Sequence, residues 1–280
     1  MDLAVIQGGR KAGLSKWFLR VPALLYVTLM ILVPLLVIVE DGFREGLSGL
    51  VHQITVPIAQ HAIKLTLWTS ALMTLINAIM GLATAYVLVR FEFPGKRLLN
   101  AIVDLPLAIP TLVTGVMLVM LYGPQSALGD FLSQKIGLDI IFAPPGIVIA
   151  LLFISFPFVV RSIQPVLMNL DLSQEEAAAT LGAKPWYTFR TVVLPTLLPP
   201  LISGSLLSFS RAVGEFGAVV IVAGNIPFKT QTAAVYVLGA VESENRLGAS
   251  AVSLLLLAIA IIVLMTANQI QKAWSARHEN

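Results

Sequence analysis

Three polar side chains recur at helical spacing inside an apolar segment of this chain. Ser208, Arg211 and Glu215 lie three and four residues apart within Leu197–Ala223, so on a helix they would share one face. Ionisable groups in a membrane span are costly and must face protein or water. Arg211 and Glu215 either pair across one turn and pack this span against a neighbour, or Arg211 supplies positive potential to an anion along a path lined with hydroxyls. Self-pairing leaves little net charge for a substrate, which favours the structural hypothesis.

A second polar group lies in another apolar segment, around two prolines four residues apart. Pro106 and Pro110 each remove an amide donor, which predicts a kinked helix. Asp104 is expected to cap this kink or to pair with a basic residue of a neighbouring helix. Thr111 and Thr114 carry hydroxyls one turn apart, which either line a path or donate back to their own helix.

The polar segment 171–195 separates two apolar segments and carries the signals of a helix followed by a turn. Ser173 is predicted to cap the helix start, with Glu176 three positions later, as a capping box requires. The alanines from Ala177 onward extend the helix, and Gly182 suits its left-handed end.

A second short helix is predicted after this turn. Pro185 suits its first position, and Trp186, Phe189 and Val193 recur at helical spacing and form an apolar face. The pair Leu194-Pro195 is predicted to end it. The segment as a whole is therefore expected to be a helix–glycine–helix elbow, called the elbow below.

Composition restricts the class of protein that positions these groups. Of 280 residues, 57% are hydrophobic and only 12% are charged, where a soluble domain carries about 25% charged residues. Cysteine is absent, which excludes disulfides, thiolate chemistry and cysteine metal sites. The three histidines are scattered and form no ligand cluster.

Six apolar segments are long enough, or nearly so, to cross a bilayer as helices of about 20 residues. They are Val21–Val39, Leu65–Val89, Leu98–Tyr122, Pro144–Val160, Leu197–Ala223 and Leu247–Ala267. The prediction is an all-α membrane protein with six transmembrane helices in a single domain, 1–280, whose core is 21–267. The first apolar segment is long enough to cross and no small-residue cleavage site follows it, so a cleaved signal peptide is not expected.

Lysine and arginine counts set the predicted orientation. With both termini inside, the internal segments hold 12 basic residues and the external loops hold 4, which predicts an N-in, C-in topology by the positive-inside rule. Segments 1–20, 161–196 and 268–280 are then cytoplasmic. The basic residues thus act as topology determinants, and a nucleic-acid partner is not expected.

The elbow resembles the cytoplasmic signature loop of the membrane-spanning subunits of ABC importers. The shared pattern is Glu-Ala-Ala, three residues, Gly, nine residues, then apolar-x-Leu-Pro, with Val192 at the apolar position. The resemblance implies the type I ABC importer permease fold and an elbow that docks on an ATPase subunit. The residues it assigns to this coupling are Glu176, Ala177, Ala178, Gly182, Leu194 and Pro195.

The chain itself has no nucleotide-binding motif. A Walker A loop needs Gly, four residues, then Gly-Lys-Ser/Thr, and the pair Gly95-Lys96 is followed by Arg97. No cofactor is therefore expected on this chain, and ATP and Mg would bind to the partner ATPase.

Four further runs narrow the resemblance to sulfate/thiosulfate permeases, of the T-type. They are 104–111, 155–165, 210–218 and 223–227, and the similarity covers roughly residues 20–270. It implies two copies of an ATP-binding cassette subunit, a homologous W-type permease, a periplasmic sulfate-binding protein and surrounding lipid in a bacterial cytoplasmic (inner) membrane. Hydroxyls and helix N-termini bind any oxyanion, so the choice of sulfate rests on this resemblance alone.

Three alternatives remain at this point. A molybdate or tungstate importer permease shares the elbow and the run around Glu215. A secondary transporter or channel leaves the elbow unexplained and would predict inverted repeats or a charged relay. An intramembrane enzyme would need a nucleophile–base pair or a metal cluster inside the spans, where no histidine lies.

Overall fold

The structure is a computed structural model of this chain, and it describes residues 11–278. Residues 1–10 of the predicted cytoplasmic N-terminus, and 279–280 of the predicted tail, lie outside the described residues. The elements are α1 (Lys11–Val27), α2 (Val33–Gly42), α3 (Gly46–Thr55), α4 (Pro57–Arg90), α5 (Lys96–Ala108), α6 (Thr111–Tyr122), α7 (Ala127–Phe131), α8 (Pro144–Asn169), α9 (Leu172–Thr180), α10 (Pro185–Thr188), α11 (Leu194–Val213), α12 (Gly217–Ala223), α13 (Ala233–Glu242) and α14 (Arg246–His278). Three π-helical turns, Thr28–Leu32, Leu132–Ile136 and Phe189–Val193, join neighbouring helices.

Five helical segments of the described chain are long and apolar enough to cross a membrane, and a bent pair makes a sixth. The five are Arg20–Gly42, Pro57–Arg90, Pro144–Asn169, Pro185–Val213 and Arg246–Lys272, and the bent pair is α5 with α6. Each predicted span coincides with one of these helical segments over most of its length, but the predicted spans Leu98–Tyr122 and Leu197–Ala223 each contain a break. The helix ends differ from the predicted ones because several helices continue past the apolar residues into polar turns.

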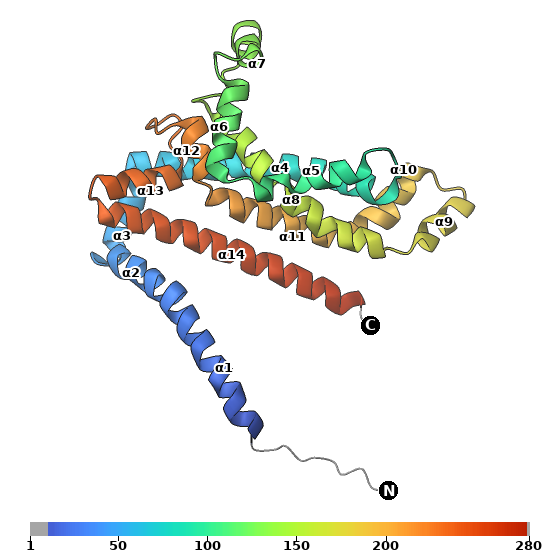
Figure 1. The fold of residues 1–280 in the computed structure, drawn as a ribbon, viewed down its shortest axis with the longest axis horizontal. Helices are drawn as coiled ribbons and strands as arrows, with labels where there is room; N and C mark the ends of the chain where they lie inside the picture. Colours follow the sequence, from blue (N-terminus) through green and yellow to red (C-terminus); the bar gives the residue numbers. More distant parts are fainter. Residues whose placement is uncertain (1–10, 279–280) are drawn as a thin grey trace.

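The centre of the bundle is formed by α4, α8 and α11, with α14 packed along α11 (Figure 1). Its largest apolar cluster includes Val159, Ile163, Leu167 and Leu197, each fully buried. Gly81 of α4 lies so close to α8 that a Cβ atom there would sit 2.8 Å from Val159 Cγ1. Small residues of this kind allow helix backbones to approach closely in a membrane.

The first span stands apart from this bundle. Figure 1 shows α1 diverging from α14, and none of the most apolar 18 residues of Arg20–Gly42 is buried. Within this segment α2 packs on α14, where Gly42 meets Leu254. In a membrane-spanning chain this apolar surface faces lipid or another subunit.

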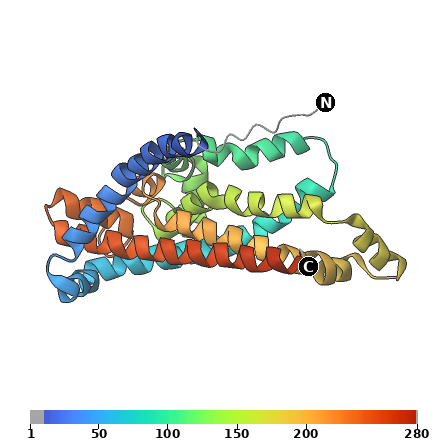
Figure 2. The ribbon, with the colours of Figure 1, turned by 90° about the horizontal axis from the view of Figure 1, so that it is seen from below.

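Several polar turns lie at opposite ends of the bundle, whereas α6 and α7 project from its side (Figure 1). The turn between α4 and α5, the elbow of α9 and α10, and the end of α14 lie toward one end in both views, while α3 and α13 lie toward the other (Figures 1 and 2). This grouping agrees with the predicted topology, in which the α4–α5 turn, the elbow and the C-terminus lie on one side of the membrane and the segments with α3 and α13 lie on the other. Helix α13 was not predicted from the sequence, because its ten residues are too few to cross a bilayer.

Candidate functional site

The first arm of the elbow is α9, and its start differs from the prediction. Asp171, rather than Ser173, caps the helix: its Oδ1 accepts the Ser173 amide at 2.9 Å and its Oδ2 accepts the Ser173 hydroxyl at 2.7 Å. The predicted capping box of Ser173 and Glu176 is therefore wrong, since a carboxylate one residue before the helix is an equally good acceptor and is also favoured by the helix dipole. The two hydrogen bonds from Ser173 hold the pKa of Asp171 below its usual value.

The turn of the elbow is formed as predicted. Gly182 has φ +80°, a left-handed conformation that other residues adopt only at a cost. Its amide donates to the Ala179 carbonyl at 2.9 Å, and the Ala183 amide donates to the Ala178 carbonyl at 3.0 Å. These bonds satisfy the last carbonyls of α9 and reverse the chain.

The second arm does not end where it was predicted to end. Pro185 opens α10 as expected, but Leu194 and Pro195 begin α11, and the helix runs on to Val213. The Leu194 amide bonds to the Phe189 carbonyl, five residues back, so the helix widens into a π turn just before the proline. Proline in the first turn that follows interrupts little, and the elbow therefore leads directly into a membrane span.

The tip of the elbow is exposed and partly apolar. Glu176 and Ala177 are exposed, and Ala178 is half-buried. Leu181, beside the turn, and Trp186, at the start of the second arm, are 88% and 70% exposed. Exposed apolar side chains beside a carboxylate are typical of a surface that another protein covers.

The elbow is fixed to α4 by residues that the sequence did not single out. Arg90, at the end of α4, pairs with Glu175 of α9 at 2.5 Å. Tyr86, one turn earlier, packs edge-on against Phe189. The sequence did contain a basic residue at the end of a span and an acidic residue next to the signature. Spacing alone could not show that these two residues, 85 positions apart, form a pair.

Asp104 pairs with a basic residue of a neighbouring helix, one of the two outcomes expected for it. Arg161 of α8 donates from Nε to Asp104 Oδ1 at 2.7 Å and from its terminal nitrogen to Oδ2 at 2.5 Å. The same guanidinium also donates to the side chain and backbone of Asn100 and to Gln164. A bidentate pair with this many acceptors is a rigid connection between α5 and α8.

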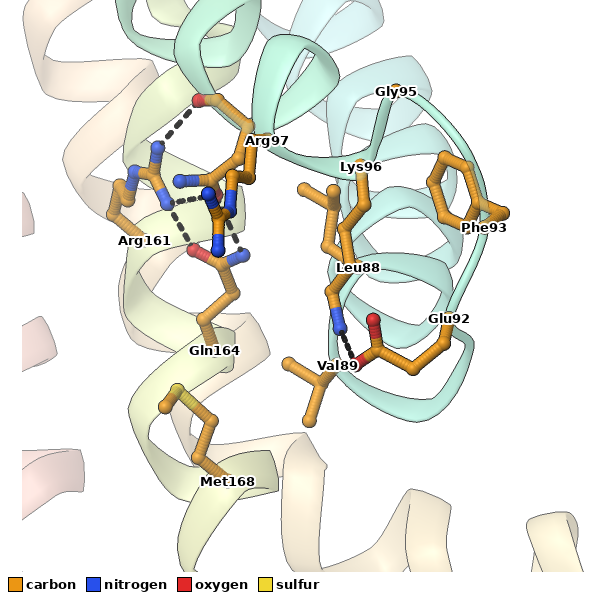
Figure 3. A pocket seen from close by; sticks show the side chains of 11 residues that line it. Leu88, Val89, Glu92, Phe93, Gly95, Lys96, Arg97, Arg161, Gln164 and Met168 are labelled. Carbon is orange, nitrogen blue, oxygen red and sulfur yellow. Dashed lines mark hydrogen bonds and ion pairs between the residues drawn. The ribbon is translucent and has the colours of Figure 1, made fainter.

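A pocket of about 710 Å³ lies beside this network, between the end of α4, the start of α5 and α8. Figure 3 shows Arg161 and Gln164 extending from α8, with Arg97 over them and the Lys96–Glu92 pair on the other wall. Because Asp104 pairs with Arg161 and Glu92 pairs with Lys96, this pocket carries less positive charge than its three basic residues suggest.

The predicted kink between α5 and α6 is a complete break. Ile109 and Pro110 separate the two helices, which meet at 112°. Thr111 lies against α12, where a Cβ added to Gly217 would be 2.2 Å from its hydroxyl. Thr114 is 1% exposed and its hydroxyl has no partner in the described part of the chain, so the bond back to its own helix, one of the two alternatives for it, is not formed.

The predicted span Leu197–Ala223 is also broken, so its polar stripe is not continuous. Ser208 and Arg211 lie on α11, which ends at Val213, and Glu215 lies in the break before α12. Glycines on either side of Glu215 make the break inexpensive, because glycine is a poor helix former. This break cannot be recognised from composition, since the residues on both sides of it are as apolar as those of an unbroken membrane-spanning helix.

The predicted pairing of Arg211 with Glu215 is confirmed at 2.6 Å, with the side chains 37% and 2% exposed. The other oxygen of Glu215 accepts the Ala218 amide at 3.1 Å and so caps α12. Ser208 is fully buried and donates to the Ser155 carbonyl of α8 at 3.2 Å. The three groups of the stripe are therefore each engaged with protein, and the two helix breaks lie side by side through α6 and α12.

Comparison with known proteins gives matches over most of the chain. The family model described as binding-protein-dependent transport system inner membrane component matches residues 77–277. A "Probable sulfate transport system permease protein cysT" of Nephroselmis olivacea is 42% identical over 248 residues, which cover 89% of this chain and 87% of that one. The "Sulfate transport system permease protein CysT" of a Synechocystis strain is 40% identical over 260 residues, covering 93% and 90%.

Solved structures match in fold at low identity. A chain of a bacterial ABC transporter involved in the import of the acidic polysaccharide alginate has a TM-score of 0.77 and 17% identity, covering 94% of this chain and 96% of that one. A chain of the MetNI methionine ABC transporter, in an inward-facing conformation, has a TM-score of 0.54 and 19% identity, covering 78% and 99%. The predicted helical membrane fold is confirmed by these matches.

Proposed function

This chain belongs to the family of binding-protein-dependent transport system inner membrane components, and from this premise we propose that it is the membrane-spanning permease subunit of an ATP-driven sulfate importer. The substrate is proposed from the two relatives, which are named sulfate transport system permeases and match nearly the whole chain. Thiosulfate belongs to the same proposal.

The observation that carries the proposal is the elbow. Its tip presents Glu176 with exposed apolar side chains, and its second arm continues without interruption into a membrane span. A partner that moves this tip therefore moves a span. In the proposal, the partner is one of two ATP-binding cassette subunits, which bind ATP and Mg, and its basic residues face Glu176.

The energetics of the substrate explain why such a partner is needed. Moving a dianion against a negative-inside potential of 100 mV costs about 4.6 kcal/mol, twice the value for one charge. In the proposed cycle, a periplasmic sulfate-binding protein delivers the anion at the end that holds α13. ATP binding pulls the elbows of this chain and of a homologous W-type permease together, which opens the path outward, and hydrolysis resets it.

Within the membrane we assign Asp104, Ser208, Arg211 and Glu215 to holding the helices together. Their contacts support this role, because each charge has an opposite partner 2.5–2.6 Å away and the Ser208 hydroxyl donates to a carbonyl. Thr111 and Thr114 remain candidates for the path, since the Thr114 hydroxyl is unsatisfied in the described structure. The proposed location is the cytoplasmic (inner) membrane of a bacterium, with both termini inside.

The substrate is tested by competition. The importer would be assembled from this chain, its partner permease, the ATPase subunits and the binding protein, and labelled sulfate uptake would be measured with excess unlabelled thiosulfate or molybdate. We expect thiosulfate to block uptake more strongly than molybdate. An assembled complex that hydrolyses ATP but takes up molybdate instead of sulfate would identify a molybdate importer.

A further inference from the structure

One ion pair joins the elbow to the membrane bundle outside the signature residues. Arg90 is the last residue of α4, and Glu175 lies in the first turn of α9, one position before the signature begins. The two side chains meet at 2.5 Å and are only 12% and 20% exposed. For comparison, the neighbouring pair Lys96–Glu92 lies within one turn of chain, and Glu92 is 88% exposed.

Because the Arg90–Glu175 pair is largely buried, each of its charges depends on the other. Each charge has lost much of its water, so removal of one partner leaves the other charge poorly compensated. The Nε atom of Arg90 is buried and has no partner among the described residues, which makes Glu175 the carboxylate on which this guanidinium depends. Both charges are also oriented favourably, a cation at the end of α4 and an anion at the start of α9.

The second arm of the elbow is held to the same turn of α4 by aromatic rings. Tyr86 packs edge-to-face on Phe189, with centroids 5.3 Å apart at 84°, and Phe189 stacks on Trp186 at 5.6 Å. Aromatic pairs of this geometry contribute beyond the area they bury. The last turn of α4 therefore contacts both arms, one through charge and the other through ring packing.

Resting on the proposed function, we propose that the last turn of α4, through Arg90 and Tyr86, is a positioning element that carries movement of the elbow into α4. The second arm already moves α11, with which it is continuous. The Arg90–Glu175 pair gives the first arm a separate connection to α4, which packs along both α8 and α11 in the core. An ATPase pulling on the elbow then displaces two helices of the bundle together, whereas α11 alone would slide past α4.

Charge reversal tests this role. Arg90→Glu and Glu175→Arg are each expected to raise the ATP consumed per sulfate transported by about fivefold or more, the lower end of typical coupling between sites, in complexes that still assemble. The double variant restores the pair with opposite sign and is expected to return most of the coupling. The control is the reversal of the neighbouring pair in the α4–α5 turn, Glu92→Lys with Lys96→Glu, whose side chains are 88% and 25% exposed and do not contact the elbow; it should leave the ratio unchanged.

A second readout needs no transported ion. The chain has no cysteine, so a spin label can be placed on α4 alone at Ala71→Cys, an exposed position. Its spectrum is expected to change between nucleotide-free and vanadate-trapped complexes, to stop changing in either single reversal, and to change again in the double variant. Lack of sulfate uptake by the otherwise unmodified complex would reject the proposed substrate and leave this comparison intact. Single reversals that keep the spectral change, or a double variant that assembles without regaining it, would overturn the positioning role.

Discussion

Glu215 makes two interactions at the place where a membrane span breaks. One carboxylate oxygen pairs with Arg211 and the other accepts the Ala218 amide, and the side chain is 2% exposed. A single residue therefore neutralises a charge of α11 and caps α12. Among the described residues singled out in the sequence, this one has its role determined most completely by its contacts.

Replacement of Arg211 separates its two hypothetical roles. Arg211→Gln leaves Glu215 buried without its counter-charge, so we expect a loss of about 1–3 kcal/mol, below the usual cost of a broken buried pair because Arg211 is partly exposed. The melting temperature of the detergent-purified subunit checks this. The double variant Arg211→Gln/Glu215→Gln should recover part of the loss. Unchanged stability with depressed sulfate uptake would instead assign Arg211 to the anion.

At the scale of elements, the two helix breaks are held together by close packing of α6 on α12. A Cβ atom on Gly217 would lie 2.2 Å from the Thr111 hydroxyl and 3.2 Å from the Leu112 amide nitrogen. A Cβ atom on Gly115 of α6 would lie 2.9 Å from the Ala218 carbonyl oxygen of α12. The contact therefore depends on glycine on both helices.

Gly217→Ala should separate these helices. Because the added Cβ would collide with the Thr111 side chain, and the α6 backbone lies directly behind that side chain, we expect a destabilisation of about 1–3 kcal/mol, as for other overpacked sites. The matched control is Gly214→Ala in the same break, where nothing lies within 4 Å of the added Cβ and φ is −93°. Thermal unfolding of the two purified variants provides the measurement. Equal stability of both would contradict the described packing.

The sequence predicted those elements whose signals are local. Six spans followed from runs of apolar residues, and the elbow turn followed from Gly182. The break at 214–216 escaped because glycine and phenylalanine are as apolar as the helix around them. The helix end predicted at Leu194-Pro195 was wrong because a π turn before the proline lets the helix continue through it into α11. The ion pairs of Asp104 and Glu175 join residues that are 57 and 85 positions apart in the chain. Over such separations, local sequence patterns do not tell which residues of two helices meet.

At the scale of the whole molecule, the arrangement of the turns has a consequence for the membrane. The elbow and the α4–α5 turn lie toward one end, and α13 toward the other (Figure 2). The basic-residue counts predict that the elbow end faces the cytoplasm. The proposed importer needs this arrangement, since its elbow must meet the ATPase subunit and its opposite end must meet the incoming anion.

The absence of cysteine makes the orientation directly testable. Lys184→Cys in the elbow and Lys135→Cys between α7 and α8 are both exposed replacements of lysine. In intact cells, a membrane-impermeant maleimide should label the cysteine at position 135, and should label that at 184 only after permeabilisation. The reverse pattern would show that the topology is inverted.

The central claim is that an ATPase drives transport through the elbow. The most direct test is the uptake of labelled sulfate by the assembled complex in sealed vesicles. The binding protein is added on the side of the vesicle membrane that the orientation of the complex requires. Sulfate should accumulate only with ATP, and Glu176→Lys should abolish accumulation while the chain remains in the membrane, because a lysine at the exposed tip repels the basic residues expected on the ATPase. Sulfate accumulation without ATP, or undiminished by Glu176→Lys, would contradict the account.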